Sequence, residues 1–204
     1  MPKPTKTRRD LNSEATRRDM LAAAKIHFAR DGYAAAPLSA IVEAAGVTTG
    51  AVYHHFGDKQ GLFRAVAEAV EIEILQRIAA ASAGEADPWR RLVAGCMAML
   101  GICAEPHIQR IAFIDAPNVI GAREWREIER RYAFGVLQQT LQALQERGII
   151  RPCAVEILAP ILLGATIEAA TAIADAADQP AALAEAQAII GRLLDSLRRW
   201  PETR

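Results

Sequence analysis

The sequence predicts an all-α protein with a three-helix N-terminal head and a C-terminal antiparallel helical bundle, about nine helices in all. Three observations favour this class. Hydrophobic residues make up 51% of the chain but aromatic residues only 5%, and alanine, the strongest helix former, is abundant. Apolar residues recur three and four positions apart in most segments, as in amphipathic helices. No β-rich stretch competes with this pattern.

The head begins behind a polar, basic and flexible arm that we expect over residues 1–12. Ser13 suits the N-cap of a first helix, whose apolar residues fall on one stripe. The pair Asp31-Gly32 is a stop signal for this helix. The stripe consists of Met20, Leu21, Ala24 and Phe28.

Two short helices joined by a tight turn follow. Apolar residues at i, i+3, i+4 and i+7 predict the first over residues 38–45, and Gly46 supplies the turn. Thr48 can cap the second, over residues 49–55, and Gly57 closes it. The pair, in all residues 38–56, has the layout of a helix-turn-helix, whose second helix lies in the DNA major groove.

Charge is distributed unevenly, although the formal net charge is zero. Residues 1–66 hold ten Lys and Arg against six Asp and Glu, so the head carries +4 and the rest of the chain −4. A basic head suits a nucleic-acid partner. The acidic body argues against a general DNA-coating protein, which would be basic throughout.

The second short helix exposes side chains that suit contact with DNA. Hydroxyl groups can donate to phosphate oxygens or reach base edges, and Gly50 lets the backbone approach closely. Lys59, in the first turn of the next helix, can pair with a phosphate, and His55 can face either DNA or the core. The predicted DNA contacts are Thr48, Thr49, Gly50, Tyr53, His54, His55 and Lys59.

The segment AAGVTTGAVYHHFGDK, residues 44–59, followed by Leu62 and Phe63, resembles the N-terminal signature of the tetracycline-repressor (TetR, AcrR-like) family of bacterial transcriptional regulators. The upstream segment FARDGY, residues 28–33, also matches. The resemblance implies an all-helical homodimer with a DNA-binding head and a larger ligand-binding body. It places Val52 and Phe56 at packing positions of the family, and at its DNA-contacting positions Thr48, Thr49, Gly50, Tyr53, His54 and Lys59.

Two residues depart from the pattern of this family. Many relatives have Thr where Pro37 stands, and Arg or Lys where Thr49 stands. The first change removes a helix cap and a phosphate contact, and the second removes a long base-reading side chain. The operator sequence therefore cannot be inferred from the family.

The body is expected to form an antiparallel bundle. A long helix over residues 58–82 connects it to the head, and further helices are predicted near residues 88–104, 106–116, 122–147, 154–176 and 181–199. We therefore expect a DNA-binding domain over residues 13–57 and a ligand-binding and dimerisation domain over residues 58–204.

A ligand pocket inside such a bundle would be largely apolar. Candidate lining residues are Met97, Cys103, Phe113, Trp125 and Tyr132, although an ordinary core role explains each of them as well or better. Asp115 and Asn118 interrupt an apolar stretch, which indicates a functional loop or a capped helix end, and we favour the cap.

The last two helices have broad apolar faces, and small residues such as Gly164 would allow close approach between helices. In the TetR family the equivalent pair forms a four-helix dimer interface. The resemblance thus implies an interface that includes Leu158, Leu162, Ala165, Ala169, Ile190, Leu193 and Leu197.

We expect no catalytic residue, cofactor or metal site, because paired carboxylates, nucleophile elbows, phosphate loops and HExxH spacing are missing from the sequence. Cys96, Cys103 and Cys153 fit small hydrophobes, although the seven-residue spacing of the first two leaves a redox sensor open. Apolar runs such as residues 157–167 are interrupted by Pro160 and Gly164 and predict no membrane span. Met1–Asp10 lacks the apolar segment of a signal peptide, so we expect a cytoplasmic protein.

The hypothesis that follows is a ligand-responsive repressor, released from a palindromic DNA operator when a largely apolar small molecule binds the body. The long helix from Asp58 would transmit the change, because a dimer must hold its two recognition helices about 34–36 Å apart. An activator with the same DNA contacts remains an alternative, and an enzyme of unknown type is a weaker one.

Overall fold

The computed structural model describes residues 8–199, and they form an all-α protein, as predicted. The head contains α1 (Arg8–Ala35), α2 (Leu38–Ala44) and α3 (Thr49–Phe56), and α4 (Lys59–Ser82) leads from it into the body. The body continues with α5 (Pro88–Cys103), α6 (Pro106–Ile108), η1 (Gln109–Asp115), η2 (Pro117–Gly121), α7 (Ala122–Glu129), η3 (Arg130–Phe134), α8 (Gly135–Glu146), α9 (Val155–Asp175) and α10 (Gln179–Asp195).

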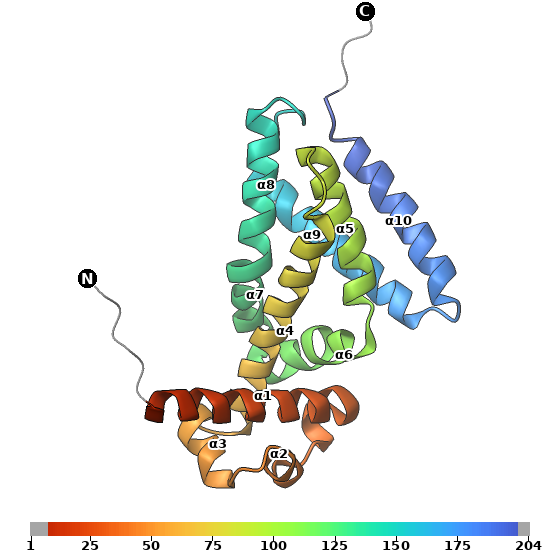
Figure 1. The fold of residues 1–204 in the computed structure, drawn as a ribbon. Helices are drawn as coiled ribbons and strands as arrows, with labels where there is room; N and C mark the ends of the chain where they lie inside the picture. Colours follow the sequence, from red (N-terminus) through yellow and green to blue (C-terminus); the bar gives the residue numbers. More distant parts are fainter. Residues whose placement is uncertain (1–7, 200–204) are drawn as a thin grey trace, which may run out of the picture.

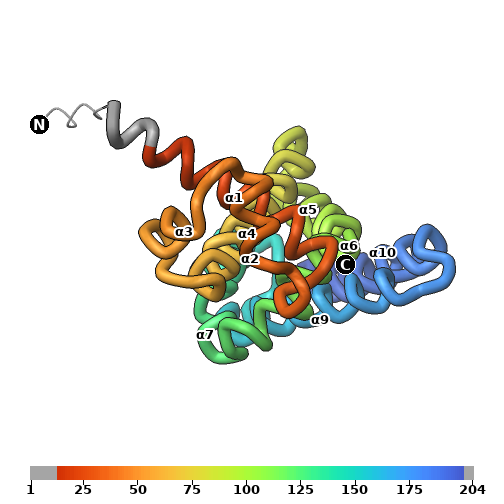
Figure 2. The backbone as a smooth tube through the Cα atoms, turned by 90° about the horizontal axis from the view of Figure 1, so that it is seen from below, coloured from red at the N-terminus to blue at the C-terminus, as the bar shows by residue number. Residues whose placement is uncertain are grey.

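The head lies at one end of the molecule (Figure 1). Helix α1 runs across this end with α2 and α3 on its outer side, and α4 rises from the head between the body helices. The view from the head end places α2 and α3 on either side of the start of α4 (Figure 2). Since α4 packs against α1 and α3 in the head and against α5 in the body, one continuous helix joins the two parts.

The first helix differs at both ends from the sequence prediction. Helix α1 begins at Arg8, so Ser13 lies inside it rather than at its N-cap, and residues 1–7 of the predicted arm lie outside the described residues. At Gly32 the backbone leaves helical geometry, with φ 76° and ψ 165°. Positive φ is accessible to glycine at little cost, which explains why the predicted stop signal works as a sharp kink.

One hydrophobic cluster extends from the head into the body. The rings of Phe28 and Phe63 pack edge to face with centroids 5.1 Å apart, and Tyr33 lies 5.1 Å from Phe63. The same cluster continues through Ile111 of η1 and Ile128 of α7. A second cluster, around Leu100, Leu141, Ile150 and Leu194, holds α5, α8, α9 and α10 together. The shared first cluster means that the head is packed onto the body and is not simply tethered to it.

Two body helices contain turns wider than α-helical ones. The predicted helix over residues 106–116 becomes α6 followed by η1, and the one over residues 122–147 contains η3 between α7 and α8. Both η1 and η3 are π-helical, a geometry that is frequent at functional sites. Gly121, with φ 98°, separates η2 from α7.

Helix α9 corrects one expectation. It runs for 21 residues through Pro160 and Gly164 without a break, so neither residue interrupts its apolar sequence. By length and composition alone it could cross a membrane, a test that buried helices of folded proteins also pass. Here α9 packs against α5, α8 and α10 as part of the bundle.

Candidate functional site

The turn between α2 and α3 has the geometry of a helix-turn-helix. Gly46 takes φ 64°, a value that favours glycine, and the N–H of Val47 donates to the carbonyl of Val42 at 3.0 Å. The Thr48 side chain caps α3, since its Oγ1 accepts a hydrogen bond from the Ala51 N–H at 3.3 Å. Pro37 occupies the N-cap of α2 and gives it no side-chain hydrogen bond. These local interactions fix the angle between the two helices.

The outer face of α3 is exposed. Val52 is fully buried on the inner side, whereas the Tyr53 side chain is 56% exposed. His55 is half-buried, and its ring lies 5.1 Å from that of His54 and beside Phe56. The predicted contacts that the structure exposes together are Thr48, Thr49, Gly50, Tyr53 and His54.

Lys59 is held differently from the other predicted contacts. It is half-buried at the start of α4, with its ammonium group over the Tyr33 ring, 4.7 Å from the centroid. Burial lowers the pKa of Lys59 from its usual value. Arg17 of α1 is not among the predicted contacts, yet it is exposed and its guanidinium lies over the Phe56 ring, 5.2 Å from the centroid. The basic side of the head therefore includes α1.

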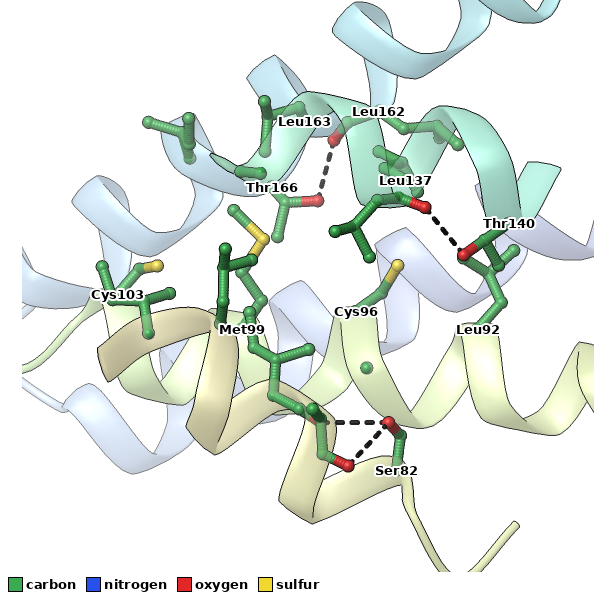
Figure 3. A pocket seen from close by; sticks show the side chains of 18 of the residues that line it. Ser82, Leu92, Cys96, Met99, Cys103, Leu137, Thr140, Leu162, Leu163 and Thr166 are labelled. Atoms are coloured by element: carbon green, nitrogen blue, oxygen red, sulfur yellow. Dashed lines mark hydrogen bonds between the residues drawn. The ribbon is translucent and has the colours of Figure 1, made fainter. Parts of the chain in front are cut away.

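A cavity of about 450 Å³ lies in the body between α4, α5, α8 and α9, with η1, α7 and η3 each contributing one residue. This is within the range of small-molecule sites. Figure 3 shows Cys96, Met99 and Leu137 pointing into the same space. Other apolar residues that line it include Ile74, Ile78, Leu92, Val136, Leu162, Leu163 and Ile167.

Only two of the five predicted pocket residues line this cavity, namely Cys103 and Phe113. Met97 instead borders a shallow depression beside Arg77 and Glu105. Trp125 is buried and Tyr132 half-buried in the cluster that joins head and body. For these three residues the core explanation fits the structure, because the sequence pattern gives burial but not the direction in which a side chain points.

The polar groups around the cavity fall into two kinds. Hydroxyl groups are satisfied by their own helices, with Thr166 donating to the Leu162 carbonyl at 2.8 Å and Thr140 to the Val136 carbonyl at 2.8 Å. The second kind is carboxylate, from Glu71 and Glu129. Burial and the nearby charge of Glu129 raise the pKa of Glu71 to about 7, and burial raises the pKa of Glu129 as well.

Two cysteines border the cavity. Burial raises the pKa of Cys96 to about 11 and that of Cys103 to about 12, the latter also through the charges of Glu71 and Glu105. Thiolates are the reactive form of cysteine, so both thiols are poor redox sensors at neutral pH. Both fit the interpretation as small hydrophobes.

Polar contacts connect the cavity wall to the head. The Asp115 carboxylate of η1 accepts a hydrogen bond from the Tyr33 N–H at 2.8 Å and lies 3.3 Å from Arg110 Nε. At the start of α4, Gln60 Nε2 donates to the Val119 carbonyl at 2.6 Å. Further ion pairs across this junction join Lys25 to Glu73 and Arg64 to Glu124.

The last two helices carry exposed apolar side chains. Ile157 and Ile161 of α9 are each 60% exposed, and Ile189 and Leu193 of α10 are 43% and 47% exposed. Of the seven predicted interface residues, Leu162 and Ile190 are buried within the protomer, whereas Leu193 is exposed. Leu158, Ala165, Ala169 and Leu197 are half-buried.

Comparison with known proteins identifies this architecture. Residues 20–66 match the family described as bacterial regulatory proteins, tetR family. Residues 89–197, more than half of the chain, match the tetracyclin repressor-like C-terminal domain. The chain belongs to the TetR family. As the sequence resemblance implied, it has a TetR-type head, and it also has a TetR-type body, for which the sequence offered only a general helical pattern.

Other TetR-family proteins resemble the chain over different lengths. A TetR-family transcriptional regulator from Pectobacterium atrosepticum is 34% identical, with a TM-score of 0.79 over 97% of this chain and all of that one. The fatty acid degradation regulator FadR from Bacillus halodurans has the same fold, with a TM-score of 0.70 and 18% identity over 89% of this chain and 99% of its own.

Curated relatives match mainly through the head. The HTH-type transcriptional repressor AcnR from Corynebacterium glutamicum is 44% identical over 52 residues, 26% of this chain and 28% of its own length. An HTH-type transcriptional repressor from Mycobacterium tuberculosis is 39% identical over 71 residues, 35% of this chain and 36% of its own. The match thus spans about a third or less of these repressors, so what their bodies bind does not transfer.

Proposed function

We propose that this TetR-family regulator is a cytoplasmic transcriptional repressor that leaves its DNA operator when a small molecule fills the cavity of its body. The single observation that carries this proposal is the position of η1. Its Phe113 lines the cavity, and two residues later Asp115 binds the backbone of Tyr33 in the head. A ligand that moves η1 therefore acts on a contact that positions the DNA-binding unit.

In this proposal residues 13–57 form the DNA-binding domain, and α3 enters the major groove. The exposed hydroxyls of Thr48, Thr49 and Tyr53 reach phosphates or base edges, and the bare backbone at Gly50 permits close approach. His54 and His55 lie at the end of the same helix, where Lys59 follows. Lys59 contacts a phosphate once its ammonium group leaves the Tyr33 ring.

Residues 58–204 form the ligand-binding and dimerisation domain. The exposed side chains of Ile157, Ile161, Ile189 and Leu193 support a homodimer formed through α9 and α10, because large apolar side chains exposed on adjacent helices mark interaction surfaces. An isologous dimer presents two copies of α3 to the DNA. Its operator is then palindromic, with half-sites about one helical turn apart or a multiple of that.

The release step needs only a modest change. Couplings between two ligand sites are typically about 1–3 kcal/mol, which is roughly 5- to 150-fold in affinity. Two contacts can carry such a coupling here, since Asp115 grips the end of α1 and Val119 of η2 accepts a hydrogen bond from Gln60 of α4. A shift of η1 and η2 would alter the tilt of both head helices.

Selection of bound DNA from a random pool, with the full-length protein, tests this function for any operator sequence. We expect a palindromic sequence to be enriched, and the purified protein to bind it as a dimer. Enrichment of no sequence, or binding that does not depend on sequence, would rule out an operator-specific repressor.

A further inference from the structure

One carboxylate lies buried at the wall of the cavity. Glu71 of α4 is 4% exposed, and its carboxylate faces the apolar space described above. Among the side chains that the structure describes, none donates a hydrogen bond to it or pairs with it as a cation. A buried carboxylate in this situation is costly, and such groups gather at functional sites.

The remaining groups around the cavity do not relieve this cost. Glu129 of α7 brings a second carboxylate, and the Cys103 thiol of α5 is held neutral by its raised pKa. Arg91 is the one cation among the described lining residues, but it is exposed and donates two hydrogen bonds to the Glu85 carbonyl. The electrostatic character of the cavity is therefore apolar and negative.

We propose that the effector of this protein is an apolar monocation, with its positive charge against the Glu71 carboxylate and its hydrocarbon part against the side chains of α5, α8 and α9. This inference rests on the proposed function and adds the chemical class of the ligand. An ammonium or similar group supplies the missing partner of the carboxylate, and burial of the hydrocarbon supplies the remaining affinity. A fatty acid or another anion is repelled by Glu71 and Glu129.

The protonation of Glu71 provides an independent signature. Its pKa of about 7 means that it is mostly neutral at pH 6 and mostly ionised at pH 8. A cation with a fixed charge binds the ionised form better, so its affinity rises with pH, approaching tenfold per unit below pH 7. Glu129, whose charge helps to raise the pKa of Glu71, shares this titration.

Isothermal titration calorimetry with three eight-carbon probes tests the inference on the full-length protein. The probes are octyltrimethylammonium, octanol and octanoate, which differ in charge but share one chain length. At pH 8 we expect the cation to bind about tenfold or more tightly than octanol, and octanoate to bind most weakly. Equal or tighter binding of octanol or octanoate, or no binding of the cation, would overturn the inference.

Two variants make the test specific. Glu71→Gln keeps the side-chain shape but removes the charge, and should abolish both the preference for the cation and its pH dependence while octanol binding persists. Glu127→Gln removes an exposed carboxylate two residues from Glu129 and should change neither. A cation preference that survives in Glu71→Gln would contradict the assignment of this residue.

Operator binding separates this inference from the proposed function. If octanoate rather than octyltrimethylammonium releases the protein from its selected operator, the ligand class is wrong and the repressor function stands. If the ligand-free protein binds no operator, the repressor function itself fails, whatever the calorimetry gives.

Discussion

The Asp115 carboxylate and the Tyr33 N–H form a 2.8 Å hydrogen bond across 82 residues of sequence. Tyr33 directly follows the kink at Gly32, and Asp115 ends the π-helix that lines the cavity. A β-carbon at position 32 would lie only 1.9 Å from Arg110 Nη2, so glycine also allows the close approach of η1 to α1. The end of α1 is thus fixed by the body.

Replacing Asp115 should loosen this junction. Asp115→Ala leaves the Tyr33 N–H and the Arg110 guanidinium without their carboxylate, and we expect a loss of about 1–3 kcal/mol in the free energy of unfolding. Urea denaturation measures it. Asn118→Ala is the matched control, because the Asn118 amide donates only to Ile114 one turn earlier. Equal losses in the two variants would mean that the Tyr33 contact is not special.

Asp115 also illustrates where prediction from sequence stops. A polar residue in an apolar stretch predicts a helix cap, and Asp115 does accept a backbone hydrogen bond, but from a helix 82 residues away. Local rules predict α3 well, because Gly46 and Thr48 act on their immediate neighbours. They predict the cavity poorly, since Trp125 points into the core for reasons of tertiary packing.

The exposed face of α3 gives a prediction for DNA binding. Tyr53→Phe should weaken operator binding about tenfold by removing one hydroxyl contact to a charged phosphate, with the fold unchanged, because the Tyr53 side chain is 56% exposed. Lys59→Ala should lower the slope of log affinity against log salt by about one. Fluorescence anisotropy at several salt concentrations measures both effects.

The control for these variants is Arg90→Ala, which removes an exposed cation from the body. It should leave operator affinity and its salt dependence unchanged. If all three variants bind DNA like the unaltered protein, α3 and the start of α4 do not form the interface.

The exposed isoleucines of α9 give a prediction for assembly. Ile161→Glu places a charge in the proposed dimer interface and should yield a monomer with weak operator binding, because burial of an unpaired charge is costly. Sedimentation velocity measures the mass. Ile26→Glu, at a position of α1 that is 64% exposed, should leave the oligomeric state unchanged. A dimer that persists in Ile161→Glu would place the interface elsewhere.

The raised pKa of Glu71 predicts how stability depends on pH. Folding raises this pKa from 4.5 to about 7, so the folded state binds the proton more tightly and the charged form destabilises the fold. The cost is absent below pH 4.5, grows between pH 4.5 and 7, and is complete above pH 7. Glu71→Gln should therefore stabilise the protein at pH 8, by up to about 3 kcal/mol.

Urea denaturation of both proteins at pH 5 and pH 8 measures this difference. The gain should be much smaller at pH 5, where Glu71 is protonated in the folded protein. A gain of the same size at both pH values would show that packing, not charge, causes it.

The most direct test of the central claim is operator affinity in a double-mutant cycle that needs no known ligand. Cys96 points into the cavity, and Cys96→Trp fills part of it as a ligand would. We predict that this change weakens operator binding roughly 5- to 150-fold in the otherwise unaltered protein, and far less in Asp115→Ala, where the junction with Tyr33 is already broken. Circular dichroism and sedimentation verify that each variant is folded and dimeric. An unchanged affinity in Cys96→Trp, or the same loss in both backgrounds, would contradict coupling through η1.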